Sequence, residues 1–156
     1  MLRSIGDFIS EITGGARQPA NFEESDYRLA AAALLVHVAT TDNNFDEDER
    51  TKLRAVLSER FQLGTEAADG LIESAIAADR DAVDLYQFTS TLNRSCDDEG
   101  RRRVVEMMFE VAYADGQLSE FEDNIVWRAA DLLHVPSRER VTIRRQVRDE
   151  TAADEN

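Results

Sequence analysis

The stretch VATTDNNFDEDE at residues 38–49 decides the fold, because a similar stretch, VAYADGQLSEFE, returns at residues 111–122. Each copy follows an apolar run with helical spacing and precedes another such run. Each copy also places an aspartate, a three-residue gap that ends in an apolar residue, a helix-capping residue and a glutamate three positions later. The sequence therefore predicts two related helical hairpins, each joined by a short acidic turn.

The repeat extends into the helix that follows each turn. An alignment without gaps brings apolar residues onto apolar residues: Leu53 onto Val126, Val56 onto Ala129 and Leu57 onto Ala130. Residues at these spacings share one face of a helix and pack toward a core. The duplication is therefore expected to repeat the packing as well as the turn.

The composition favours a single all-α domain. The 156 residues include two prolines and seven glycines, which leaves long stretches rich in strong helix formers. We expect a compact bundle of about seven helices at residues 22–150, preceded by an amphipathic arm and linker at 1–21 and followed by a polar tail at 151–156. The expected helices cover residues 25–41, 46–61, 65–77, 81–94, 99–112 and 119–133, with a last helix after Pro136. Their apolar positions, which are expected to face the core, include Val83, Tyr86, Phe121, Val141, Ile143 and Val147.

The N-terminal arm carries large apolar residues with the spacing of a short helix. They are Leu2, Ile5, Phe8, Ile9 and Ile12, and Gly14-Gly15 is expected to end the helix. Such an arm docks on its own domain, pairs with a second copy to form a homodimer, or contacts a membrane from one side. The few cations near it argue against strong lipid binding.

The net charge is −14, from 32 acidic and 18 basic residues. A surface this acidic repels nucleic acid and anionic lipid, which excludes broad phosphate binding. It attracts cations, whether metal ions or the basic surface of an unknown protein partner, and it also serves solubility alone.

The sequence offers little to a catalytic or zinc site. Cys96 is the single cysteine, and it stands beside Asp97, Asp98 and Glu99, whose charges disfavour a thiolate. His37 and His134 have no nucleophile motif beside them and no zinc-binding spacing. We therefore expect a protein without enzymatic activity. A reducing cytoplasm fits the lone cysteine and the lack of a signal-like or membrane-spanning apolar run.

Helix capping explains most of the doubled motif. Ser119 and Glu122 form a predicted capping box, and Asp46 and Glu49 repeat it with aspartate as the cap. Carboxylates in a first helical turn also face the positive end of the helix dipole. Phe45 and Leu118 are expected to anchor the two turns in the core.

Capping leaves Asp42 and Asp115 unexplained, because an aspartate at the last turn of a helix faces the negative end of the dipole. Hard oxygen ligands suit Ca²⁺ or Mg²⁺, so the turns are also candidate weak cation sites. The pattern does not match an EF-hand loop, since Leu53 and Val126 stand where its last glutamate belongs. The candidate metal ligands are Asp42, Asn44, Asp46, Glu49, Asp115, Ser119 and Glu122.

The motif Val-Ala-x-Ala-Asp-Gly-x-Leu-Ser-x-x-Glu at 111–122, with its weaker copy at 38–49, resembles the TerB-like family associated with tellurite resistance. The resemblance covers roughly residues 25–148. It implies an all-helical cytoplasmic domain with a role in metal sensing or in membrane-linked stress complexes of bacteria. The first copy departs from the pattern, with Thr41-Asp42-Asn43 in place of Ala-Asp-Gly.

Arginines gather at residues 101–103 and in the last predicted helix, against the acidic trend of the chain. They either pair with carboxylates of the same chain or form a docking patch for an acidic partner. The leading hypothesis is a non-enzymatic scaffold module that binds a divalent cation at its acidic turns. The alternative is a pure protein-interaction module in which those acids only cap helices.

Overall fold

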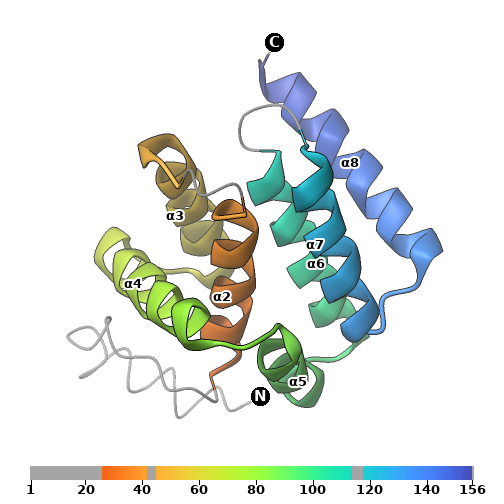
Figure 1. Ribbon diagram of the computed structural model, residues 1–156. Coiled ribbons are helices and arrows are strands. Elements are labelled where there is room, and N and C mark those ends of the chain that lie inside the picture. The colour runs from red at the N-terminus through yellow and green to blue at the C-terminus, as the bar shows by residue number, and fades with distance from the viewer. Residues whose placement is uncertain (1–25, 42–44, 114–117, 156) are drawn as a thin grey trace.

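The computed structural model describes residues 26–41, 45–113 and 118–155, with the side chains of residues 153–155 left out. This part of the chain folds into seven α-helices and no strand, which confirms the all-α prediction (Figure 1). The predicted arm at residues 2–13 lies outside the described residues. The helices are α2 (Tyr27–Ala39), α3 (Glu47–Phe61), α4 (Thr65–Asp81), α5 (Tyr86–Ser95), α6 (Asp98–Ala112), α7 (Glu120–Leu132) and α8 (Ser137–Glu155).

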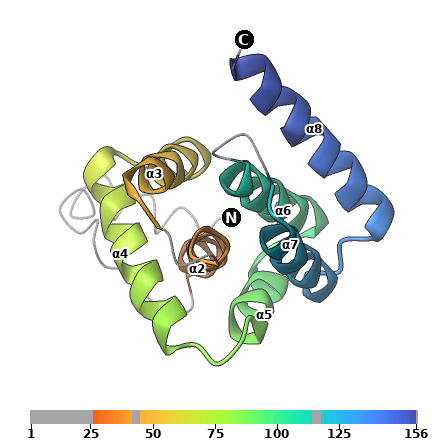
Figure 2. The same ribbon diagram turned by 45° about the horizontal axis from the view of Figure 1, so that its top comes forward.

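Helix α2 runs through the centre of the bundle. It contacts α3, α4, α5, α6 and α7, and Figure 2 shows it end-on with these helices around it. Its four consecutive alanines, residues 30–33, are at most 2% exposed, so every side of the helix is covered. Small side chains let neighbouring backbones approach closely, which is why an alanine run suits a helix enclosed on all sides.

The two copies of the repeat form the hairpins α2–α3 and α6–α7. All six matched positions of the repeat that follow the turns are buried, none more than 4% exposed: Leu53, Val56, Leu57, Val126, Ala129 and Ala130. Phe45 and Leu118 are partly buried against the same core, as predicted. The duplication therefore repeats the packing as well as the turns.

The connection between α4 and α5 differs from the prediction. A break was expected at residues 78–81, but α4 continues to Asp81 and α5 begins only at Tyr86. Val83 and Tyr86 were expected to face the core, and they are 96% and 65% exposed. The prediction was wrong because their three-residue spacing is typical of one helix face, whereas the segment before Tyr86 is not helical.

Helix α8 packs against α6 and is longer than expected. Ile143 and Val147 are buried as predicted, whereas Val141 is 36% exposed. The backbone of residues 151–155 continues the helix, so the predicted polar tail is helical as far as Glu155. No helix in the described ranges is long and apolar enough to cross a membrane.

Candidate functional site

The first acidic corner joins α2 to α3. The hydroxyls of Thr40 and Thr41 donate to the carbonyls of Val36 and His37, both at 2.9 Å, and so satisfy acceptors that the end of α2 leaves open. On the far side of the turn, Oδ1 of Asp46 accepts the backbone N–H of Glu49 at 2.9 Å. Oε1 of Glu49 accepts the backbone N–H of Asp46 at 3.2 Å, which completes the predicted capping box.

The second corner, from α6 to α7, repeats this construction with a hydroxyl in place of the capping carboxylate. Oγ of Ser119 accepts the backbone N–H of Glu122, and Oε1 of Glu122 accepts that of Ser119, both at 3.0 Å. The two corners lie at the same end of the bundle, because α2 and α6 both end there (Figure 1). Both capping boxes are therefore confirmed, and they share one face of the molecule.

The two corners differ in burial and charge. Glu122 is only 8% exposed, whereas Glu49 is partly exposed and Asp46 lies in solvent. Residues 47 and 48 add two exposed carboxylates to the first turn of α3. The first corner therefore presents more accessible carboxylate oxygens than the second.

The predicted ligand set is only partly placed by the structure. Asp42, Asn44 and Asp115 lie outside the described residues. The other four predicted ligands form two separate capping pairs, one at each corner. In the described ranges, no group of three or more His, Cys, Asp or Glu is arranged to hold a metal ion.

Most of the arginine clusters pair within the chain. Arg101 bonds Asp98, and Arg102 bridges Glu99 at 2.8 Å and Glu139 of α8 at 3.3 Å. Arg103 forms an ion pair with Glu99, and Arg144 forms one with Asp123, both at 3.4 Å. Intramolecular pairing, one of the two readings of these clusters, is thus what the geometry shows for them.

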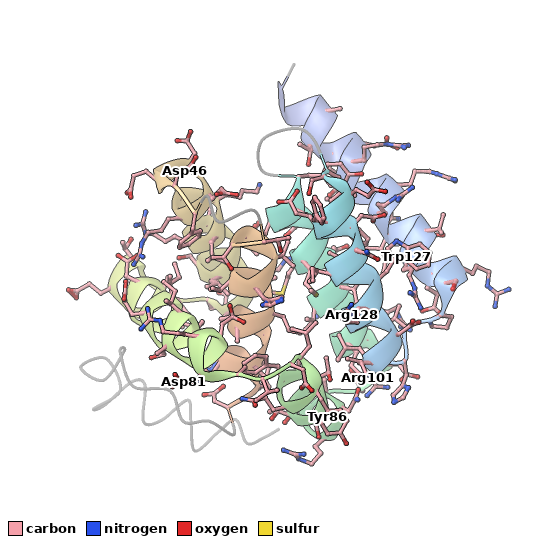
Figure 3. The ribbon with its side chains drawn as sticks, viewed as in Figure 1. Asp46, Asp81, Tyr86, Arg101, Trp127 and Arg128 are labelled. Carbon is pink, nitrogen blue, oxygen red and sulfur yellow. The ribbon has the colours of Figure 1, made fainter. Side chains whose placement is uncertain are left out.

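One arginine of α8 is buried, which the sequence pattern did not predict. Arg140 is 3% exposed, and its guanidinium lies over the ring of Trp127, with 4.4 Å from Cζ to the ring centroid. It donates to the carbonyl oxygens of Trp127 and Val135 and to Oδ1 of Asp131, at 3.1, 3.0 and 2.5 Å. Figure 3 shows Trp127 on the side of α7 that faces α8. These contacts fasten α8 to the end of α7.

The corner beneath this arginine is shaped by a left-handed residue. His134 has φ of 62°, the N–H of Val135 reaches the carbonyl of Ala130 at 2.9 Å, and that of His134 reaches Asp131 at 3.1 Å. This pair of bonds is the Schellman arrangement that closes a helix C-terminus. His134 therefore serves the helix end through its backbone.

The side chain of His37 joins two helices, and the thiol of Cys96 is partly buried. Nδ1 of His37 lies 2.9 Å from Oδ1 of Asp79 and joins α2 to α4. Burial, and to a lesser degree the charge of Asp97, raises the pKa of the Cys96 thiol, while Arg101 opposes the shift. A raised pKa lowers the thiolate fraction at neutral pH, in line with the expectation from sequence.

A groove of about 540 Å³ lies between α6 and α8. Three arginines and three glutamates line it, with Ile143 among the other lining residues. The glutamates are paired within the chain: Glu99 and Glu139 with Arg102, and Glu106 with Arg60 of α3 at 2.5 Å. This balanced lining gives the groove no strong preference for either sign of charge.

A comparison with protein families matches residues 28–145 to the family model described as tellurite resistance protein TerB. The chain belongs to the TerB family. The match begins in α2 and ends in α8, so the TerB region contains both hairpins and both acidic corners. No curated protein and no solved structure matches the chain. The resemblance seen in the doubled acidic motif is thus confirmed over the TerB domain.

Proposed function

We propose that this TerB-family chain is a non-enzymatic cytoplasmic binding module that holds a hard divalent cation weakly at its acidic corners. Ca²⁺ and Mg²⁺ are the candidates, because carboxylate and amide oxygens are the ligands that both ions prefer. The family match supports a role related to tellurite resistance. A stress role exercised through an unknown protein partner is part of the same proposal.

One observation carries the proposal: Asp46 holds its cap with a single oxygen. Oδ1 accepts the N–H of Glu49, and Oδ2 accepts no hydrogen bond from any described residue. In the sequence, Asp42 and Asn44 precede Asp46 by four and two positions. A cation here would meet the positive end of the α3 dipole, which opposes binding by about 0.3–1 kcal/mol. We therefore expect dissociation constants on the order of 1 mM.

The two corners supply a matched pair of substitutions. Asp46→Ser copies the cap of the second corner into the first, so it removes a carboxylate and keeps the capping hydrogen bond. Calorimetric titration with CaCl₂ and MgCl₂ should show affinity lowered about fivefold or more, because divalent affinity follows the number of charged ligands. The melting temperature without cation should change little, because serine and aspartate cap about equally well.

Asp97, the N-cap of α6, provides a control for bulk charge. Its Oδ1 accepts the N–H of Gly100 at 2.8 Å, and it lies far from both acidic corners. Asp97→Ser removes the same charge and should leave cation affinity unchanged. Ser119→Asp should raise affinity at the second corner. Equal binding by the Asp46→Ser and Asp97→Ser variants, or no heat with the wild type at millimolar cation, would contradict the proposal.

The second candidate is a protein-interaction module whose acids only cap helices. The completeness of both capping boxes favours it, since every described predicted ligand already has a structural task. An Asp42→Ala/Asp115→Ala variant separates the two functions. Loss of cation response in this variant supports the first candidate, whereas a wild type without cation response, together with unchanged capture of a partner by the variant, supports the second.

A further inference from the structure

Two large apolar side chains lie uncovered at the connection between α4 and α5. Val83 is 96% exposed and Tyr86, three positions later, is 65% exposed. The segment between and beyond them is well anchored, because Leu85 and Phe88 are at most 5% exposed. Oδ1 of Asp84 also accepts the N–H of Tyr86 at 2.9 Å. The exposure therefore belongs to an ordered turn, at a cost in apolar surface left in water.

The connection that carries this apolar pair lies at the end of the bundle where α2 begins. Figure 3 shows Tyr86 at the end of the bundle opposite Asp46, and α2 begins at that same end. Helices α2 and α5 pack against each other. Asp26, which caps the start of α2, therefore lies at the same end of the bundle as Tyr86.

The segment that precedes Asp26 has an apolar face of its own by sequence. Residues 2–13 place five large apolar residues at helical spacing, and a helix this short is marginal in water without a surface to pack on. The 12 residues from 14 to 25 link this segment to Asp26, and they span at most about 43 Å when fully extended. The arm can therefore reach this end of its own bundle with chain to spare.

We propose that residues 2–13 pack their apolar face onto Val83 and Tyr86 of the same chain. The surrounding charge favours this occupant over an anionic membrane, because Asp81 and Asp84 are exposed on the same connection. The short tether favours it over a second copy, since it holds the arm at a high local concentration. This inference does not depend on the cation proposal.

Cross-linking within the full chain tests the contact. In a Cys96→Ser background, cysteines at Ile9 and Val83 are treated with a short bis-maleimide, and the products are resolved by mass and by proteolytic mapping. The matched control pairs Ile9→Cys with Phe121→Cys, another exposed apolar residue (70%), at the start of α7 and the opposite end of the bundle. We expect intramolecular cross-linking at Val83 to be about fivefold faster or more.

Two further variants separate specific packing from mere tethering. Ile5→Ser/Phe8→Ser and Tyr86→Ser should each slow the Ile9–Val83 cross-link toward the rate at Phe121, because each removes one side of the apolar contact. Equal rates at Val83 and Phe121, or rates that these serine variants do not change, would overturn the proposal. Cross-linked dimers in place of the intramolecular product would also overturn it and assign the surface to a second copy. Thermal melts confirm that each variant is folded.

Discussion

Arg140 covers the indole of Trp127 while donating to that residue's own carbonyl oxygen. The contact joins the first turn of α8 to α7 through both the side chain and the backbone of a single partner. Desolvated cation–π contacts contribute about 2 kcal/mol, and a buried acceptor that loses its donor costs about 1–3 kcal/mol. The ion pair with Asp131 contributes little further stability, because the side chain of Asp131 is 73% exposed.

Replacing this arginine should therefore destabilise the fold strongly. We expect Arg140→Met to lower the free energy of unfolding by about 2–4 kcal/mol, since it removes the cation and leaves the carbonyls of Trp127 and Val135 without their donor. Urea unfolding followed by circular dichroism measures the loss. Arg138→Met, an exposed neighbour on the same helix, should change stability by less than about 0.5 kcal/mol. Similar effects of the two substitutions would contradict the assignment.

The two capping boxes should contribute similarly to stability. Ser119→Ala and Asp46→Ala each remove the acceptor of an N3 amide, and each should cost about 1 kcal/mol in denaturant unfolding. The double variant should lose close to the sum, because no hydrogen bond joins the described residues of one corner to those of the other. A loss confined to one corner would show that the other is held by different contacts.

The carboxyl of Glu110 should give stability a distinctive pH dependence. Burial raises the pKa of Glu110 above its usual 4.5, despite the nearby Arg60 guanidinium at 2.7 Å, and the charge of Glu106 adds to the shift. Because the folded state then binds this proton more tightly than the unfolded state, this contribution to stability falls as pH rises from 4.5 through the raised value.

Glu110→Gln removes this titration. The stability of the wild type relative to the Gln variant should therefore decline as the pH rises above 4.5, as measured by unfolding at several pH values. Arg60 also loses an ion-pair partner in the variant. This loss lowers the stability of the variant by a similar amount at each pH, so it changes the pH dependence less than the lost titration does. A relative stability that instead increases with pH would mean that ion pairing outweighs burial at this site.

The thiol of Cys96 should react slowly. Its raised pKa and partial burial predict alkylation at pH 7.5 about tenfold or more slower than for the same thiol in urea-unfolded protein. Arg101→Ala should slow it further, since this guanidinium favours the thiolate. A rate equal to that of the unfolded chain would rule out the predicted environment.

The fold was largely predictable because its signals are local. Capping boxes involve residues three positions apart, and helical spacing reports which face is apolar, so the hairpins and the anchors Phe45 and Leu118 followed from short stretches of sequence. The TerB resemblance rested on the same stretches. The capping boxes of Asp46 with Glu49 and of Ser119 with Glu122 were likewise predictable from their place at a helix start.

The differences arise where tertiary structure decides. Val83 and Tyr86 fit a helix face by spacing, but the helix starts only at Tyr86, and periodicity does not mark a helix start. Phe121 was expected to face the core from the first turn of α7, yet it is 70% exposed. Arg140 resembles any surface arginine until α7 and α8 are brought together.

The enclosure of α2 determines whether either copy of the repeat can fold alone. Since α2 is covered by helices from both copies and from the connection between them, neither copy possesses a complete interior. In a fragment that ends after α3, the faces of α2 that pack against the later helices would be exposed to solvent. A fragment that starts at α6 would lack α2, the central helix against which α6 and α7 pack. The two copies therefore depend on each other for a closed core.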